Sequence, residues 1–211
     1  MEKIISKLWI NHLDKLLSGD LPGYEAQKLM EPPMRNSFSM DSSKARKAAT
    51  LLALYYEEDR WNFILIERST HPLDKHKGQI SFPGGSIEKG ENAANAAIRE
   101  ANEEIGIPAS NIRLIGQLSP LFIPVSNFMV QPYVGLIDLD GIKLKKEDAE
   151  VEQILHVPLN ELIDEQNIAY QDMKMTNGFT LKRVPVFRLA NQQVWGATAM
   201  MLSEFRQLIL A

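Results

Sequence analysis

Residues 85–107, GSIEKGENAANAAIREANEEIGI, constrain the fold of this chain more than any other stretch. Their periodicity predicts a helix over residues 92–105, with Gly106 as its C-terminal cap and Pro108 as the block to its continuation. Successive helical residues turn by about 100°. This spacing sets three carboxylates on one face: Glu100, Glu103 and Glu104. The acidic face borders a predicted buried stripe of four apolar residues: Ala94, Ile98, Ala101 and Ile105.

Three carboxylates on one helical face repel one another, and the macrodipole adds to this repulsion near a helix C-terminus. The only cation nearby in the sequence is Arg99. A divalent cation would compensate the charge, because Mg²⁺ and Mn²⁺ bind carboxylate and carbonyl oxygens and usually bridge to phosphate. A solvated acidic patch is the alternative, since charge runs are usually solvent-exposed faces. The spacing alone leaves both interpretations open.

The residues before the helix favour a ligand site. A short strand is predicted at residues 80–85, and it ends in Gly84 and Gly85. A glycine pair can bring bare backbone close to a ligand or an ion. The loop that follows returns the chain to the helix, and its last residue, Glu91, lies eight residues before Arg99. An ion pair between these two side chains would orient the loop on the helix.

Length and composition indicate one domain with enough apolar material for a core. The chain has 211 residues, of which 45% are hydrophobic, and a net charge of −4. This charge argues against a general nucleic-acid binder, whose signature is a basic excess. The absence of cysteine excludes disulfides and zinc–thiolate sites and fits a reducing compartment. We therefore expect a cytoplasmic protein.

The N-terminal residues 1–18 predict an amphipathic helix. They lack the continuous apolar core of a signal peptide, and no segment approaches the ~18 apolar residues of a membrane span. We expect this helix to pack on the domain, with binding to a membrane surface as the alternative. A loop rich in Pro, Ser and charge follows at residues 31–45. Residues 1–40 are therefore interpreted as an N-terminal helical extension and loop.

Strands dominate the remainder of the chain. They are predicted at residues 48–57, 62–68, 80–85, 112–118, 128–138, 150–159 and 181–189. The segment EDRW between the first two indicates a hairpin. Two more helices are predicted, at residues 159–165 and 198–210. This mixture predicts an α/β fold (α+β mixed) with a mixed sheet and helices on its faces.

Residues 85–107 resemble the Nudix box, a pattern of glycine, glutamate and arginine at fixed spacing. Its positions are met by Gly85, Glu91, Arg99, Glu100, Ala101, Glu103, Glu104, Gly106 and Ile107, with Ala101 smaller than the usual apolar residue. The resemblance implies a Nudix-type α/β/α sandwich with a catalytic strand–loop–helix over residues 41–211. It also implies metal-dependent hydrolysis of a pyrophosphate in a nucleoside diphosphate derivative.

The resemblance assigns a role to each of these side chains, with Mg²⁺ or Mn²⁺ as the cofactor. The expected metal ligands are Glu100, Glu104, Glu103 and Gly85, the last through its carbonyl oxygen. Either Glu103 or Glu150 is the expected general base, and Arg99 is expected to orient the carboxylates. Three residues are expected to be structural: Gly85, Glu91 and Gly106.

A second group of residues resembles the signature of the coenzyme A pyrophosphatase subfamily. The matching residues are Arg68-Ser69, His71, Lys75-His76, Gly78-Gln79 and Phe82-Pro83-Gly84-Gly85. The likeness implies substrate binding by Arg68, His71, Lys75, His76, Gln79 and Ser81. The implied reaction cleaves coenzyme A, or an acyl derivative, to 3′,5′-ADP and 4′-phosphopantetheine or its acyl form. Two positions depart from the pattern: Pro72 looks inserted, and Asp74 stands where the subfamily has arginine.

Other functions stay open at this point. Within the class, the substrate could be ADP-ribose, NADH or a dinucleotide polyphosphate. From other classes, the chain could be a nucleotide-sensing module without catalysis or a structural domain, although a sensor would be expected to have lost one of the three glutamates. The expected partner is a small-molecule nucleotide, with no nucleic acid and no membrane. A homodimer is also open, since the N-terminal helix could contact a second subunit.

Overall fold

The computed structural model describes residues 2–35, 42–69, 78–174 and 178–211. Its α-helices are α1 (Glu2–Ser18), α2 (Gly23–Gln27), α3 (Ala93–Ile105), α4 (Leu159–Ile163) and α5 (Gly196–Leu210). Its strands are β1 (Arg46–Glu57), β2 (Arg60–Arg68), β3 (Ile80–Ser81), β4 (Gly84–Ser86), β5 (Ile112–Gln117), β6 (Leu121–Ile123), β7 (Phe128–Ile137), β8 (Val151–Pro158), β9 (Ile168–Lys174), β10 (Thr180–Leu189) and β11 (Gln192–Val194). Short 3-10 turns are η1 (Lys28–Met30), η3 (Ser42–Lys44), η4 (Ala109–Asn111) and η5 (Glu165–Asn167).

The central sheet is mixed, as the sequence predicts. Strand β1 runs parallel to β7 and antiparallel to β2 and β4. The sheet extends antiparallel from β2 to β3 and β8, and from β7 to β5 and β6. A smaller antiparallel sheet has the order β11-β10-β9. The predicted α/β class is therefore confirmed.

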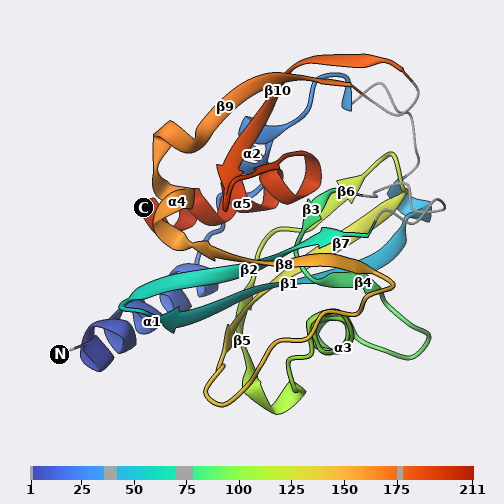
Figure 1. Ribbon diagram of the computed structural model, residues 1–211. Coiled ribbons are helices and arrows are strands. Elements are labelled where there is room, and N and C mark those ends of the chain that lie inside the picture. Colours follow the sequence, from blue (N-terminus) through green and yellow to red (C-terminus); the bar gives the residue numbers. More distant parts are fainter. Residues whose placement is uncertain (1, 36–41, 70–77, 175–177) are drawn as a thin grey trace.

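The elements form layers around the central sheet (Figure 1). Helix α3 covers one face, while α5 and the β9–β10 hairpin lie over the other. Each face has its own apolar cluster, and adjacent residues of β1 belong to different clusters: Leu51 packs on the α3 side and Leu52 on the α5 side. Side chains alternate along a strand, so an unbroken apolar run fills both clusters.

The predicted hairpin between the first two strands is confirmed. Glu57 pairs with Arg60, so the loop consists of Glu58 and Asp59 alone. Both have positive φ angles, 50° and 60°, which a two-residue type I′ turn requires.

Most other predicted strands are also confirmed, with boundaries that shift by one or two residues. These are β5, β7, β8 and β10. The strand predicted at residues 80–85 is divided into β3 and β4, because Phe82 and Pro83 lie between them. Four elements have no counterpart in the sequence prediction: α2, β6, β9 and β11.

Helix α1 packs against β5 and α5, as expected for a helix that covers the domain. Leu13 and Leu17 are buried in the α5-side cluster, and Trp9 and Leu16 pack against it. Leu8, on the same helix, is 64% exposed. In the described ranges, no helix is both long enough and apolar enough to cross a bilayer.

Candidate active site

The candidate site begins at the glycine pair of β4, which pairs with β1 so that Gly84 lies opposite Thr50. A Cβ on Gly84 would lie 2.4 Å from the carbonyl oxygen of Ala49. A Cβ on Gly85 would lie 2.4 Å from Oε1 of Glu100. Only glycine allows the backbone to approach both the sheet and the helix carboxylate so closely. The bare backbone of β4 is therefore in direct contact with the acidic helix.

Helix α3 has the expected ends but a different buried face. It begins after Asn92, whose Oδ1 accepts a hydrogen bond from the Asn95 N–H at 2.8 Å, and it ends at Gly106 with φ 74°. The buried residues are Ala96, Ala97, Ala101, Glu104 and Ile105, whereas Ala94 and Ile98 are only half-buried. The predicted stripe is therefore wrong in part. The small side chains of the buried alanines let the helix lie close to β1, and this orientation brings Glu104 to the sheet.

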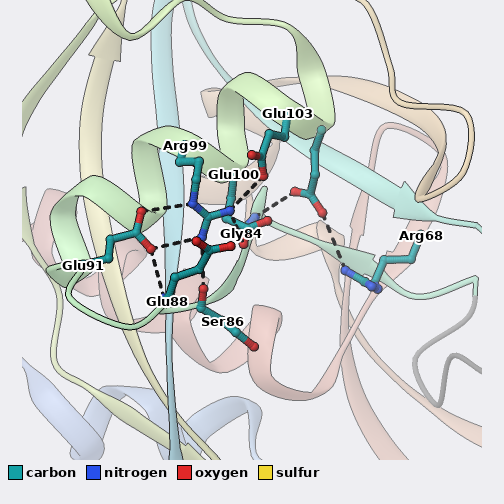
Figure 2. Close-up of polar contacts among 9 residues, drawn as sticks. Arg68, Gly84, Ser86, Glu88, Glu91, Arg99, Glu100 and Glu103 are labelled. Atoms are coloured by element: carbon teal, nitrogen blue, oxygen red, sulfur yellow. Dashed lines mark hydrogen bonds and ion pairs between the residues drawn. The ribbon is translucent and has the colours of Figure 1, made fainter.

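Arg99 holds the carboxylates around it, as predicted (Figure 2). Its Nε and Nη2 donate to the two carboxylate oxygens of Glu91 at 3.0 and 3.1 Å. Its Nη1 donates to Glu100 at 3.0 Å and to Glu103 at 2.8 Å. Nη2 also donates to the Ser86 carbonyl at 3.1 Å, which ties the loop to the helix. The hydrogen bonds lower the pKa of the Glu91 carboxyl and raise that of the Arg99 guanidinium.

Glu104 is the most buried of the three glutamates on α3, at 2% exposure. Its Oε2 accepts a hydrogen bond from the Gly84 N–H at 2.8 Å, and its Oε1 lies 3.7 Å from Nη1 of Arg68. Burial raises the pKa of the Glu104 carboxyl to about 8, although the Gly84 N–H and Arg68 act in the opposite direction. Burial also raises the pKa of Glu100, against the effect of Arg99. Both carboxyl groups are therefore shielded from water, and their hydrogen bonds and neighbouring arginines compensate only in part for the lost solvation of the charged form.

Glu150 lies close enough to act on both of these carboxyls. Its negative charge contributes to the raised pKa of Glu100 and of Glu104. The segment that carries it is held by two backbone hydrogen bonds: Glu147 N–H donates to the Glu104 carbonyl at 3.0 Å, and Ser69 N–H donates to the Glu150 carbonyl at 2.9 Å. The structure thus brings together the box glutamates and the acidic segment before β8.

A divalent cation fits the Glu100 and Glu104 end of this arrangement. Within the described residues, Glu104 Oε1 is buried and accepts no hydrogen bond. A cation would compensate the two partly buried charges. A complete ligand set is not assembled, however: across the described residues, no three His, Asp or Glu side chains form a group that could hold a metal ion. Glu103 has a 55% exposed side chain and is turned to Arg99, so it would have to leave that arginine to act as a third ligand.

Three of the six predicted substrate-binding residues lie in the described structure, and all three line one cavity: Arg68, Gln79 and Ser81. The other three, together with Pro72 and Asp74, lie outside the described residues: His71, Lys75 and His76. Arg68 ends β2, and its backbone is held to Gln79 by an N–H···O bond of 3.0 Å. Ser81 Oγ is buried and has no hydrogen-bond partner within the described ranges.

The cavity has a volume of about 790 Å³, within the usual range for small-molecule sites. It lies between the central sheet and α5, on the face opposite α3, with Ala48 and Val130 on one side and Met201 on the other. Gly84 and Gly85 also line it. The acidic helix and the cavity therefore meet at the glycine pair of β4.

Several cavity residues were not identified from the sequence. Two arginines line the cavity in addition to Arg68: Arg35, after η1, and Arg46, at the start of β1. Arg46 lies over the Phe128 ring, 4.1 Å from its centroid. A single arginine before a strand carries no local motif, so only the register of β1 on β7 reveals this pair.

Comparison with known proteins agrees with this geometry. The NUDIX domain model matches residues 44–177. Two proteins named "Uncharacterized Nudix hydrolase NudL" are similar along most of their length. The one from Yersinia enterocolitica is 34% identical over 179 residues, covering 84% of this chain and 87% of that protein. The one from Photorhabdus laumondii is 32% identical over 181 residues, covering 85% and 91%.

Among solved structures, the Nudix hydrolase RenU from M. smegmatis matches with a TM-score of 0.50 at 14% identity, covering 78% of this chain and 86% of that one. This likeness concerns the fold alone. The family match and the relatives together define the class: the chain belongs to the Nudix family. It is a Nudix pyrophosphohydrolase.

Proposed function

We propose that this enzyme cleaves the pyrophosphate of coenzyme A or an acyl-coenzyme A. The products are 3′,5′-ADP and 4′-phosphopantetheine, or its acyl form. One observation carries the proposal: Arg68 and Gln79, which match the coenzyme A signature, line the same cavity as the glycine pair of the box, together with the expected substrate-binding residue Ser81. A pyrophosphate at the glycine pair would have Arg68 beside it, and guanidinium groups suit phosphate oxygens.

The lining of the cavity also suits this substrate. Its walls carry exposed apolar side chains from three separate segments: Met34, Val125 and Phe179. The pantetheine arm and an acyl chain need such surface, whereas the ribose of ADP-ribose does not. The cavity therefore favours a substrate with a nucleotide at one end and an apolar arm at the other.

In the proposed reaction, Glu100 and Glu104 would hold Mg²⁺ or Mn²⁺. The bound ion would neutralise phosphate oxygens and lower the pKa of water. Gly84 positions Glu104 through its N–H, and Arg99 positions Glu100. The Gly85 carbonyl remains a candidate ligand.

Either Glu103 or Glu150 serves as the general base that takes the proton of the attacking water. Both are exposed. Their glutamine variants would separate the two, because loss of the base lowers kcat more than it changes KM.

Product analysis tests the proposal. The purified enzyme is incubated with coenzyme A, acyl-coenzyme A, ADP-ribose, NADH and diadenosine polyphosphates, each with Mg²⁺, Mn²⁺ or EDTA. Release of 3′,5′-ADP from coenzyme A or its acyl form, lost with EDTA and in Glu104→Gln, is the expected result. Turnover of another substrate instead would agree with pyrophosphate hydrolysis by a Nudix enzyme but would refute coenzyme A as the substrate. Nucleotide binding without any turnover would refute the catalytic role.

A further inference from the structure

The three arginines that line the cavity have different surroundings. The Arg35 guanidinium donates to the Phe122 carbonyl and, at 3.0 Å, to Met200 Sδ. Burial lowers the pKa of Arg35, as expected for a cation held inside the fold. Arg68 faces Glu104 at 3.7 Å. Arg35 is therefore engaged with the protein itself, and Arg68 lies beside Glu104, where the proposed pyrophosphate would bind.

Arg46, which lines the cavity from the first residue of β1, is placed differently. Its side chain is exposed, and its guanidinium lies over the ring of Phe128 at 4.1 Å. Among the described residues, its side chain makes one hydrogen bond, from Nη2 to the Ser126 carbonyl at 3.3 Å. A guanidinium with one face on an aromatic ring keeps its N–H groups at the edge, where they can form a fork on an anionic oxygen pair.

The strand register fixes where this cation lies relative to the chemistry. Arg46, Ala48 and Thr50 alternate onto the same face of β1, and Thr50 pairs with Gly84. At a rise of ~3.3 Å per residue, the Cα of Arg46 is about 13 Å along the strand from that of Thr50. Ala48, between them, pairs with Ser86. A nucleotide whose pyrophosphate lies at the glycine pair can therefore extend along β1 toward Arg46.

We propose that Arg46, supported by Phe128, binds the phosphomonoester on the substrate's ribose, the 3′-phosphate if the substrate is coenzyme A. The proposal rests on the proposed function for the identity of that group. It supplies a cation that the loop signature lacks, because Asp74 stands where the subfamily has arginine. Phe128 acts as a support that keeps the guanidinium in place in the cavity lining.

The test compares coenzyme A with 3′-dephospho-coenzyme A in the full-length enzyme. Arg46→Gln should lower kcat/KM for coenzyme A about tenfold or more, because one charge-assisted contact is lost. It should leave kcat/KM for 3′-dephospho-coenzyme A within about twofold. Arg46→Lys should fall in between, since lysine keeps the charge and loses the fork. Equal losses on both substrates, or no loss on coenzyme A, would overturn the proposal.

Arg60→Gln is the matched control, because it removes the same charge at the other end of the β1–β2 hairpin, where Arg60 pairs with Glu58 at 2.6 Å. This substitution should leave kcat/KM unchanged for both coenzyme A and 3′-dephospho-coenzyme A. The surrounding fold does not depend on Arg46, whose side chain is exposed, so folding failure is not expected.

Direct binding separates this proposal from the proposed function. Calorimetry with adenosine 3′,5′-bisphosphate and with AMP should show tighter binding of the bisphosphate by the wild type and little preference in Arg46→Gln. If that preference appears in an enzyme that does not hydrolyse coenzyme A, the phosphate subsite stands and the substrate assignment fails. If coenzyme A is hydrolysed but the preference is absent or persists in Arg46→Gln, the subsite fails alone.

Discussion

At the scale of single residues, Glu104 has surroundings unlike those of an ordinary helix glutamate. One carboxylate oxygen accepts the Gly84 N–H, and the other is buried without a hydrogen bond among the described residues. Such an arrangement costs free energy in the protein alone, because a buried charge needs full compensation. A cation bound to this carboxylate would therefore also stabilise the fold.

We predict that Glu104→Gln is at least as stable as the wild type without metal, because glutamine keeps an oxygen for the Gly84 N–H and removes a carboxyl group whose charged form is disfavoured by burial. Millimolar Mn²⁺ should raise the wild-type Tm, by about 2–4 °C for each kcal/mol of binding energy. It should not raise the Tm of Glu104→Gln. Thermal melts of the wild type and of Glu104→Gln, each with Mn²⁺ and with EDTA, measure the metal-free stability and the Tm shift. Glu103→Gln, at an exposed position, is the control that keeps most of the shift. An equal shift in Glu104→Gln would contradict the prediction.

Gly85→Ala tests the contact between β4 and α3. The new Cβ would occupy the space of Glu100 Oε1, so that the flexible carboxylate must move. We expect a loss of about a hundredfold in kcat, because small displacements of catalytic groups are costly. The free energy of unfolding should change by less than about 1 kcal/mol. Gly19→Ala is a suitable control, since its Cβ would make ordinary contacts of 3.6 Å. Full activity in Gly85→Ala would show that kcat does not depend on the position of the Glu100 carboxylate.

Sequence spacing predicted the partners of Arg99 but not the burial of Glu104. The Arg99–Glu91 pair follows from local helix and loop geometry, which one short segment determines. Which side of α3 faces the sheet depends instead on how closely its alanines approach β1. The position of Arg46 depends on the pairing of β1 with β7, two strands far apart in the sequence. Neither of these long-range relations is encoded in a local pattern.

At the scale of elements, α5 is joined to the N-terminal segment through a fully buried carboxylate, Glu204. Its Oε1 accepts from the Gly23 N–H at 3.2 Å and the Ser119 N–H at 3.1 Å. Its Oε2 accepts from Gln27 Nε2 at 2.8 Å. One side chain of α5 thus connects α2, and the loop between β5 and β6, to the core.

Glu204→Gln should destabilise the fold by about 1–3 kcal/mol, because it replaces a carboxylate that receives three N–H donors with an amide that brings donors of its own. Urea unfolding followed by circular dichroism measures this change. Glu165→Gln is the control, since its carboxylate is 88% exposed and lies 3.7 Å from Arg206. We expect a change within about 0.5 kcal/mol there. Equal effects of the two substitutions would show that the buried contacts contribute nothing specific.

The strands that the sequence did not predict all lack a recognisable local pattern. Strands β6 and β11 are three residues each, too short for an alternating pattern to appear. Strand β9 alternates half-buried and exposed residues and has no fully buried side chain, so it lacks the apolar run that marks a strand. Long apolar runs such as those of β1 and β2 can be predicted from the sequence, because their side chains fill both faces of a sheet.

At the scale of the whole molecule, helices α1 and α2 of the N-terminal segment are packed into the same core as the rest of the described chain. Leu13 and Leu17 belong to the α5-side cluster, and Arg35 lines the cavity. The division of the chain at residue 40 remains a proposal. If it marks an independent domain, that domain must fold without the contacts of α1 and α2.

Leu13→Ala measures how much this packing contributes. The side chain is 1% exposed, so the truncation should destabilise the whole protein by about 2–5 kcal/mol, with a single cooperative transition. Leu8→Ala, five residues earlier on the same helix and 64% exposed, should change the free energy of unfolding by less than about 0.5 kcal/mol. Denaturant unfolding of both variants is the measurement. A negligible effect of Leu13→Ala would show that α1 is a separable extension.

The two faces of the central sheet have a consequence for the evolution of such enzymes. The acidic helix occupies one face and the cavity the other, with the glycine pair of β4 as their meeting point. Substitutions at Val130 or Met201 can change which group is accommodated without displacing Glu104. We therefore expect that a lineage can change its substrate while the acidic helix α3 stays constant. A mutant library confined to the α5 side of the sheet is accordingly the place to select a new specificity.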